Sequence, residues 1–318
     1  MVEKRRLGQS DLMVTPICFG GNVFGWTADE KTSFALLDRF VDAGMNFIDT
    51  ADVYSAWVPG NKGGESEIIL GKWFAARKNR DKVVLATKLG SPMGEGKKGL
   101  SKKYMQEAVE ASLKRLQTDH IDLYQSHRDD PDTPVEEVLE GYQDLIKAGK
   151  VRAIGSTNFT AARMEEAQKV SAAKGLPRYE SVQPEYNMYT RAPFEAELGP
   201  FCQTNHVGVI PYYSLASGFL TGKYRKADDK GQSPRGNGVV SKYLNPRGEK
   251  ILDALDATAK EAGVSQTQVA LAWLISRPGL TAAIASASKP EQMGDLLASA
   301  ELKLSPAALA RLTEASAP

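Results

Sequence analysis

The alternation of short apolar runs with longer amphipathic segments is the feature that most constrains the fold of this chain. Eight such runs occur, and they cover residues 15–19, 47–49, 83–88, 121–126, 151–156, 181–183, 207–212 and 282–285. The runs are short and almost continuously apolar, which is typical of strands buried on both faces of a parallel sheet. They do not show the strict alternation expected of half-exposed antiparallel strands.

Helical patterns lie between these runs. They cover residues 30–43, 65–76, 101–116, 134–148, 161–173, 194–205 and 249–262. Ser101 is a plausible N-cap, and the pair Thr133-Pro134 reads as a cap followed by proline at the first helical position. The whole pattern predicts an α/β fold, a (β/α)8 TIM barrel, with residues 1–318 forming a single domain. A doubly wound open sheet is the alternative, but no G-x-G-x-x-G follows the first strand.

Two segments fall outside the alternation. Residues 5–14 read as a small β-hairpin turning at Gly8-Gln9-Ser10, in a position to close the bottom of the barrel. Residues 214–247 form a long stretch after strand seven that is rich in Gly, Ser, Pro and charge. A loop of that length in a compact domain is usually functional or mobile.

Charge and composition exclude several functional classes. The 40 basic and 39 acidic residues leave a net charge of +1, so we expect no nucleic-acid or membrane partner. We find no signal peptide and no run of about 18 apolar residues. Cys18 and Cys202 have no metal-ligand spacing and are expected to be buried thiols, with no metal site. These features predict a cytoplasmic protein, for which a homo-oligomer remains possible.

Four reactive side chains are expected at one end of the barrel. Asp49 ends strand two, Lys88 ends strand three and His127 follows strand four, while Tyr54 lies five residues beyond Asp49. Each of these alone has an ordinary structural explanation, as a turn, surface or packing residue. The active sites of such barrels lie at the carboxyl ends of the strands, so their shared position points to catalysis.

The chemistry of these four residues suits carbonyl reduction. Tyr54 can give a proton to the developing alkoxide if the ammonium of Lys88 lowers its pKa from about 10 toward neutrality. Asp49 would hold Lys88 in an ion pair, and a neutral His127 would orient the substrate oxygen. No nucleophile with a neighbouring base is evident, so the bond-making chemistry is expected from a cofactor.

The chain resembles the aldo-keto reductase family nearly from end to end. The resemblance is carried by Arg6-Leu-Gly-Gln-Ser, Asn46-Phe-Ile-Asp-Thr-Ala-Asp-Val-Tyr, Ala86-Thr-Lys, Gln125-Ser-His, Gly155-Ser-Thr-Asn-Phe, Val182-Gln-Pro-Glu-Tyr-Asn and Gly218-Phe-Leu-Thr-Gly-Lys-Tyr. It is nearest to the bacterial branch that also resembles potassium-channel β subunits. The family implies the barrel, the Asp49, Tyr54, Lys88 and His127 tetrad, and a nicotinamide cofactor bound without a Rossmann motif.

The resemblance also implies which residues hold the nicotinamide. Thr157 and Asn158 match the pair that binds its carboxamide, Gln183 matches the residue that joins them, and Tyr212 matches the aromatic residue that stacks on the ring. Gly21 and Asn22, at the end of strand one, are expected close to the nicotinamide, where glycine allows close approach of the backbone.

The phosphates would be held by two loops. The family's pyrophosphate loop corresponds to Tyr213, Ser214, Leu215, Ser217 and Gly218, although Tyr213 and Ser214 replace the usual Ser and Pro. Lys223 either pairs with the pyrophosphate or is an ordinary solvated lysine. After strand eight, Ser288 and Lys289 are suited to a 2′-phosphate near a helix N-terminus. Gln292 matches the Gln that the family carries on the next helix, and Ser286 is also expected at the cofactor. Leu296 replaces the usual Asn there, and the neighbouring Asp295 could take part or face water. These residues favour NADPH or NADP+ over NADH.

The substrate is left open by the sequence. Trp26 and Trp57 could wall an apolar substrate site, or they could be packing residues of surface loops. The first functional hypothesis is an NADPH-dependent enzyme that reduces an aldehyde or ketone, or runs in reverse on an alcohol. The second is a cofactor-binding regulatory or redox-sensing subunit, like the channel-associated members, in which turnover is incidental.

Overall fold

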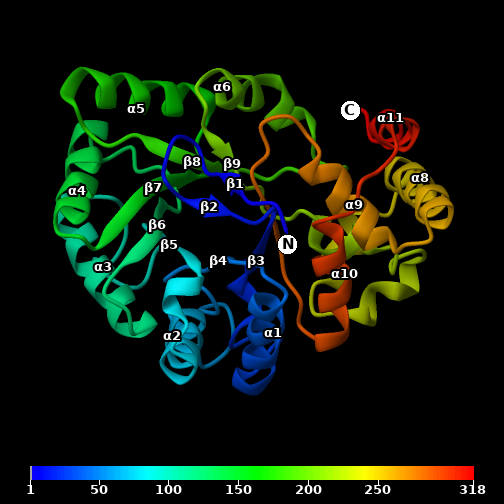
Figure 1. Cartoon of the computed structure of the whole chain (residues 1–318), viewed down its shortest axis with the longest axis horizontal. Helices are drawn as coiled ribbons and strands as arrows, with labels where there is room; N and C mark the ends of the chain where they lie inside the picture. Colours follow the sequence, from blue (N-terminus) through cyan, green and yellow to red (C-terminus); the bar gives the residue numbers. More distant parts are fainter. Residues whose placement is uncertain (1) are drawn as a thin grey trace.

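The main sheet is a parallel, eight-stranded one in the computed structural model, which describes residues 2–318 (Figure 1). Its strands are β3 (Ile17–Gly20), β4 (Phe47–Asp49), β5 (Val84–Leu89), β6 (Ile121–Ser126), β7 (Val151–Thr157), β8 (Tyr179–Gln183), β9 (Gly208–Val209) and β10 (Ala283–Ala285). The spatial order is β10-β3-β4-β5-β6-β7-β8-β9, so consecutive strands along the chain are neighbours in space. Each of the eight apolar runs overlaps one of these strands.

The sheet closes on itself between β9 and β10. The amide of Thr281 donates to the carbonyl of Val209 over 2.9 Å, and the amide of Ile284 donates to the carbonyl of Pro211 over 3.1 Å. A parallel bridge joins Val209 to Leu280. The predicted (β/α)8 barrel is therefore confirmed, and the carboxyl ends of all eight strands meet at one rim.

Helices surround the sheet as a ring (Figure 1). They are α1 (Glu30–Asp42), α2 (Glu65–Arg77), α3 (Lys102–Leu116), α4 (Val135–Lys147), α5 (Ala161–Lys174), α6 (Gly199–Thr204), α7 (Gly236–Tyr243), α8 (Pro246–Ala262), α9 (Gln266–Ile275), α10 (Met293–Ser299) and α11 (Pro306–Ala315). Ser101 caps α3 as predicted, accepting from the amide of Tyr104. The Thr133-Pro134 prediction is wrong by one position, because Pro134 itself is the N-cap of α4 and Thr133 donates instead to Asp130.

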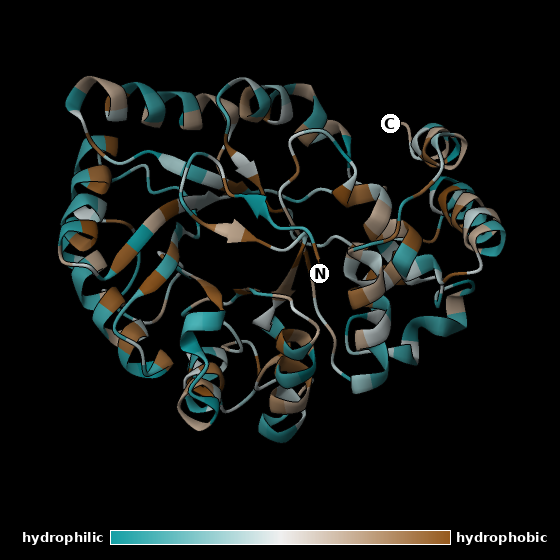
Figure 2. Ribbon diagram, in the orientation of Figure 1, coloured by the Kyte–Doolittle hydropathy of each residue, from teal (hydrophilic) through white to brown (hydrophobic). Residues whose placement is uncertain are grey.

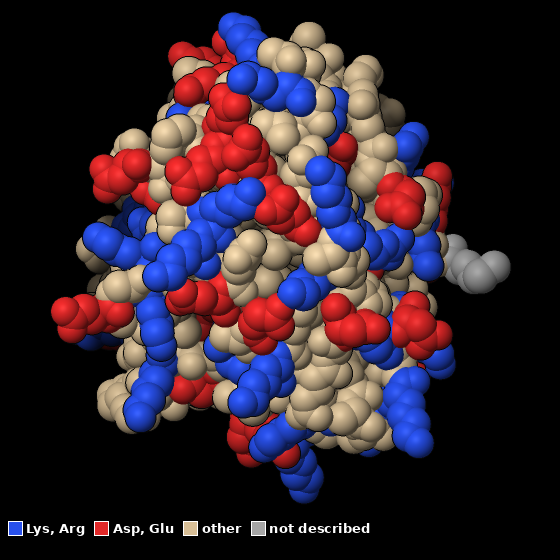
Figure 3. All heavy atoms as spheres, turned by 90° about the vertical axis from the view of Figure 1, so that its left-hand side faces the viewer, with Lys and Arg blue, Asp and Glu red and all other residues tan. Residues whose placement is uncertain are grey.

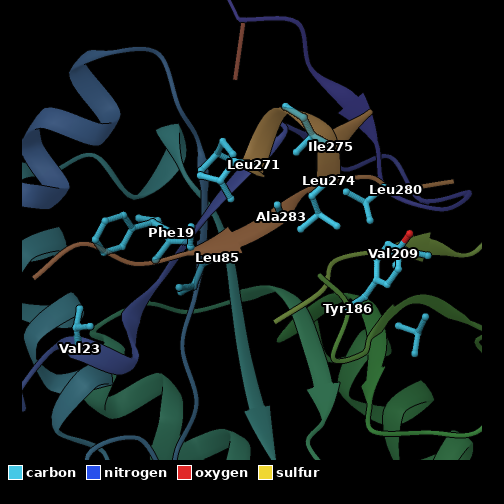
Figure 4. Packing of buried hydrophobic residues seen from close by; sticks show 14 of the residues in the cluster. Phe19, Val23, Leu85, Tyr186, Val209, Leu271, Leu274, Ile275, Leu280 and Ala283 are labelled. Atoms are coloured by element: carbon cyan, nitrogen blue, oxygen red, sulfur yellow. The ribbon is translucent and has the colours of Figure 1, made fainter. Parts of the chain in front are cut away.

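Two apolar layers hold the barrel together. Between the strands and the helices lies a large cluster that includes Phe19, Leu85 and Leu271 (Figure 4). Figure 2 shows the matching pattern, with hydrophilic residues on the outer sides of the helices and hydrophobic residues along the strands. A second, smaller cluster fills the barrel interior and includes Cys18, Phe47 and Leu123. Each fully buried aliphatic or aromatic side chain contributes about 1.5–3 kcal/mol to folding.

The hairpin at the N-terminus lies inside the ring of helices, in front of the strands in this view (Figure 1). Its strands are β1 (Arg5–Arg6) and β2 (Met13–Val14), paired antiparallel. Leu7, Leu12 and Val14 belong to the interior cluster, so the hairpin covers the end of the barrel opposite the rim. Gly8 has a φ of 58°, and a Cβ there would stand 2.2 Å from the carbonyl oxygen of Glu180. The hairpin predicted over residues 5–14 is therefore confirmed.

The stretch after β9 is more ordered than the long loop expected over residues 214–247. It contains two short helices, η4 (Ala216–Thr221) and η5 (Ala227–Gln232), followed by α7, and α8 already begins at Pro246. Phe219, Tyr224 and Val239 anchor it in the core. Several of the glycines that suggested a loop lie inside these short helices, such as Gly218 in η4 and Gly236 and Gly238 in α7.

Charges of both signs are mixed over the face of the molecule drawn in Figure 3. This agrees with the net charge of +1. Within residues 2–318, no helix combines the length and the apolar character needed to cross a membrane.

Candidate active site

The four side chains predicted from the strand ends come together at the rim. Lys88 lies in β5 and Asp49 at the end of β4, and both are buried. Tyr54 and His127 come from the loops that follow β4 and β6, and their ring centroids are 6.0 Å apart. The backbone amide of His127 donates to the carbonyl of Leu89, which fixes the loop beside β5.

Lys88 organises this cluster. Its ammonium donates to Asp49 Oδ2 over 2.6 Å, to the carbonyl of Thr50 over 2.8 Å and to Tyr54 Oη over 2.8 Å. Three acceptors match the three N–H groups of an ammonium. Because Tyr54 Oη accepts from Lys88, its own hydrogen stays available to a ligand; the alternative contact to Asp49 Oδ2 is long, at 3.5 Å.

Burial sets the protonation of the tyrosine. It raises the pKa of Tyr54 to about 12, although the charge of Lys88 acts in the opposite direction. The expectation that Lys88 lowers this pKa toward neutrality is therefore wrong, since burial outweighs the ammonium and Asp49 offsets part of its charge. For Lys88, burial disfavours the charge, but Asp49 and Tyr54 together raise its pKa above the usual value.

His127 is neutral at physiological pH. Burial, with smaller effects from Lys88 and Arg128, holds its pKa well below the usual value. Its Nδ1 atom is buried and has no hydrogen-bond partner within residues 2–318. A neutral imidazole beside the phenol can donate one hydrogen bond to a ligand oxygen, as expected from the sequence.

Two glutamines, of which sequence reasoning missed one, hold Asp49. Gln125 Nε2 donates to Asp49 Oδ1 over 2.9 Å, and Gln183 Nε2 donates to the same oxygen over 3.1 Å. Both glutamines are buried, in β6 and β8. Gln183 was expected at the nicotinamide, but its side-chain amide donates hydrogen bonds to Asp49 Oδ1 and to Gln125 Oε1. A glutamine near the carboxyl end of a strand that is buried throughout was the available signal for Gln125.

Two further acids, Asp52 and Glu67, lie close to the four residues, and the backbone amide of Asp52 donates to the carbonyl of Lys88. Asp52 is 2% exposed, and neither of its carboxylate oxygens has a hydrogen-bond partner in the described chain. Burial first, and then the nearby Glu67, raise its pKa to about 8, while Arg115 opposes them. Glu67 itself accepts from Arg115 Nε over 2.6 Å and from Thr87 Oγ1 over 2.6 Å. Sequence reasoning also missed Asp52.

The residues expected to hold the nicotinamide lie at the end of β7 and just beyond it. Thr157 is buried, and its Oγ1 has no hydrogen-bond partner among the described residues. Asn158 has a φ of 62° and donates to the carbonyl of His127 over 3.0 Å. Tyr212 Oη donates to Asn158 Oδ1 over 2.9 Å. An unpartnered hydroxyl beside an exposed amide and an aromatic ring fits a planar carboxamide ligand.

The ends of β3 and β10 meet at the same rim. Ser286 Oγ hydrogen-bonds the carbonyl of Gly20 over 2.7 Å and Asn22 Oδ1 over 2.8 Å. Glycine at position 21 was expected to let the nicotinamide approach the backbone closely. The structure does not support this explanation, because protein atoms occupy the space beside Gly21. A Cβ there would stand 3.0 Å from Ser66 Oγ and 3.1 Å from the carbonyl oxygen of Asp49.

The expected pyrophosphate loop has an unusual backbone. Tyr213, Ser217 and Gly218 all have positive φ, at 53°, 56° and 95°. Ser214 is buried and its hydroxyl donates to the carbonyl of Pro211, so that side chain is turned inward, while Leu215 is half-buried. Lys223 lies beside Gly218, with Nζ 3.4 Å from the position of a Cβ there. Left-handed residues of this kind commonly mark ligand-binding loops.

The turn after β10 carries the residues expected near a 2′-phosphate. Gln292 Oε1 accepts from the amides of Ser288 and Lys289, over 2.9 and 3.2 Å, so it shapes the turn. The Lys289 side chain is exposed. Leu296 is buried in the core, and Asp295 accepts from Gln268 Nε2.

The two tryptophans form a wall beside Tyr54. The ring centroids of Trp26 and Trp57 are 5.6 Å apart, and those of Tyr54 and Trp57 are 6.0 Å apart. Trp57 remains 48% exposed. The contact with Tyr54 favours the substrate-wall interpretation over simple loop packing.

A parallel barrel with a buried Lys–Asp pair and a phenol at its rim defines a class of barrel oxidoreductases. The family model described as Aldo/keto reductase family matches residues 16–317. The chain belongs to this family, and it is an oxidoreductase of the kind that acts on small-molecule carbonyl compounds.

Relatives with different printed names match most of the chain. An uncharacterized oxidoreductase, YrpG, of Bacillus subtilis (strain 168) is 35% identical over 95% of this chain and 92% of its own length. Aldo-keto reductase AFTS1 of Alternaria alternata is 35% identical over 95% of this chain and 88% of its own. A probable voltage-gated potassium channel subunit beta of Oryza sativa subsp. japonica is 35% identical over 92% of this chain and 89% of its own.

Proposed function

We propose that this protein is an NADPH-dependent reductase of aldehydes or ketones in which Tyr54 is the general acid. The observation that carries the proposal is the hydrogen bond from Lys88 to Tyr54 Oη. Lys88 occupies a lone pair of the phenol oxygen, so the phenol proton is free for the substrate. In the reverse reaction, the same group would accept the proton of an alcohol.

The other three residues of the cluster support the proton transfer from Tyr54. The ammonium of Lys88 stabilises the phenolate left behind, and Asp49, held by Gln125 and Gln183, stabilises the ammonium. Neutral His127 donates a hydrogen bond to the substrate oxygen, which fixes it near Tyr54 Oη. The bound nicotinamide supplies the hydride.

The chain offers suitable partners for that cofactor. Thr157 and Asn158 would hold the carboxamide, with Tyr212 against the ring, because the buried Thr157 hydroxyl lacks a partner in the described chain. The left-handed loop at Tyr213–Gly218, with Lys223, would take the pyrophosphate, and Ser288 and Lys289 would take the 2′-phosphate. The free, buried thiols of Cys18 and Cys202 suit a reducing, cytoplasmic compartment.

The test is the variant Tyr54→Phe in an assay of NADPH oxidation with a panel of aldehydes. Removing the acid should lower kcat by about 100-fold or more while leaving NADPH binding unchanged. The matched control is Tyr124→Phe, because the Tyr124 hydroxyl is buried without a hydrogen-bond partner in the described residues. Its activity should match that of the wild type.

Two outcomes would contradict the proposal. Normal turnover by Tyr54→Phe would remove the tyrosine from the acid role. Tight NADPH binding by the wild type without turnover of any aldehyde would instead favour a cofactor-binding regulatory subunit.

A further inference from the structure

Two side chains join the loop that follows β4 to the loop that follows β3. Ser55 Oγ donates to the carbonyl of Phe24 over 2.7 Å. Asn61 Nδ2 donates to the carbonyl of Gly25 and to the carbonyl of Ser55, over 3.2 Å in each case. Ser55 and Asn61, which we call the loop clamp, therefore bind one loop to the backbone of the other, and Asn61 also closes its own loop.

The backbone at the clamp is tightly constrained. Ser55 is fully buried and has a φ of 72°, a left-handed conformation that the surrounding contacts must hold in place. Gly25 has a φ of 74°, and a Cβ there would stand 3.0 Å from Glu65 Cβ at the start of α2. The two loops are therefore closely packed as well as hydrogen-bonded.

Each of these loops carries one of the tryptophans beside the phenol. Trp26 follows Gly25 directly, and Trp57 lies between the two clamp residues. The Trp57 ring meets the Trp26 ring at 87° and the Tyr54 ring at 66°, so both contacts are edge-to-face. The position of Trp57 relative to the phenol therefore depends on how the two loops are joined.

The clamp fixes Trp57 without burying it. Its side chain is 48% exposed, whereas those of Trp73 and Trp273 are fully buried. The ring is thus presented at the surface instead of being packed into the core. Because it lies against Tyr54, a flat apolar group attached to a carbonyl at Tyr54 Oη would cover its exposed face.

We propose that Asn61 and Ser55 are positioning residues that hold Trp57 ready for an apolar group of the substrate, so that they set the preference for carbonyl compounds with such a group without touching the substrate. The conformational entropy of the loop is lost during folding, and binding does not have to order Trp57 again. This inference rests on the proposed carbonyl reduction.

The experiment compares 2-naphthaldehyde with propanal, which is too short to cover Trp57. The wild type should reduce 2-naphthaldehyde with kcat/KM about tenfold higher or more. Asn61→Ala, which removes both hydrogen bonds, should raise KM for 2-naphthaldehyde about tenfold with kcat within about twofold of the wild type. Its kcat/KM for propanal should stay within about twofold.

Two further variants separate the clamp from general damage to the loop. Ser55→Ala removes the bond to Phe24 and should raise KM for 2-naphthaldehyde in the same way, by about threefold or more. Lys62→Ala is the matched control, because Lys62 is the exposed neighbour of Asn61 in the same loop. Its kinetic constants should equal those of the wild type for both aldehydes.

Several results would overturn the inference. They are an equal kcat/KM of the wild type for the two aldehydes, an unchanged KM for 2-naphthaldehyde in both clamp variants, and an equal loss for the two aldehydes. If neither aldehyde is reduced, the proposed function fails, and calorimetric titration with 2-naphthalenemethanol still decides the inference. Binding to the wild type that is about tenfold tighter than to Asn61→Ala supports it, and equal binding or none refutes it.

Discussion

The protonation of the site follows from burial as much as from charge. Lys88 is close enough to stabilise a phenolate, yet the pKa of Tyr54 is raised to about 12 because burial dominates. A phenol that keeps its proton at neutral pH is in the correct state to act as an acid. The same burial keeps His127 uncharged.

The first prediction at this scale concerns the pH dependence of reduction. His127 has a pKa well below 6.5 because of burial, and Tyr54 titrates far above neutrality. Neither group changes its protonation between about pH 6.5 and 7.5, so kcat/KM should be flat there. The measurement is kcat/KM at constant ionic strength. A transition near pH 6.5 that disappears in His127→Gln would show that the imidazole still titrates at its usual pH.

A second prediction concerns Asp52. Its folded-state pKa of about 8 lies above the value of about 3.9 expected in the unfolded chain, so the folded state binds the extra proton between these values. Stability should therefore fall as pH rises from about 4 to 8 and stay lower above that. Asp52→Asn has no proton to lose and should be more stable than the wild type at pH 8.5, by on the order of 1–3 kcal/mol.

Urea unfolding at pH 5 and pH 8.5 measures this. Asp228→Asn, at an exposed position, is the control and should leave the wild-type pH dependence unchanged. If Asp52→Asn shows the same loss of stability between the two pH values as the wild type, another group is responsible for the pH dependence of stability.

Sequence alone could locate Asp49, Lys88 and His127 because each stands at or just after a strand end, and barrel strands end at one rim. It could not find Gln125, whose amide points at Asp49 only once β4 and β6 are aligned with β5 between them. Asp52 was missed for a related reason. What makes it unusual is that its buried carboxylate oxygens have no hydrogen-bond partner in the described chain, which depends on tertiary contacts.

At the scale of elements, the short apolar runs gave the strands reliably because strands buried on both faces have few alternatives. Helix α9 was missed because its sequence, Gln266–Ile275, is apolar on nearly every side, and seven of its ten residues are buried. A helix without a polar face has no 3.6-residue period to detect. The glycine-rich sequence before α8 concealed α7 and two short helices.

Helix packing yields a prediction at the same scale. A Cβ on Gly71, in α2, would stand 2.1 Å from the carbonyl oxygen of Arg115 at the end of α3. Gly71→Ala should therefore destabilise the protein by about 1–3 kcal/mol, although alanine favours helices. It should also disturb the pair of Arg115 with Glu67.

Gly238→Ala is the matched control. It lies inside α7, and a Cβ there meets nothing within 4 Å, so stability should stay the same or rise by up to about 1 kcal/mol. Thermal unfolding of both variants is the measurement. A Gly71→Ala protein as stable as the wild type would mean that α2 and α3 can separate at little cost.

At the scale of the whole molecule, the barrel brings residues from both halves of the sequence to one rim. Asn22 meets Ser286, and Tyr212 meets Asn158, although 264 and 54 residues separate the partners. A cofactor held at these points would join β3, β7 and β10. Such a ligand binds only the folded chain, so its affinity adds directly to stability.

The last prediction uses this linkage to test the cofactor preference. A ligand at 100 times its Kd adds about 2.7 kcal/mol to the stability of the fold. NADPH should raise the Tm more than NADH at the same concentration, because Ser288 and Lys289 are proposed to bind the 2′-phosphate, which NADH lacks. Lys289→Met should narrow the difference between the two cofactors, whereas Lys303→Met, another exposed lysine, should not. Equal Tm shifts for NADPH and NADH in the wild type would show that the turn after β10 does not bind the 2′-phosphate.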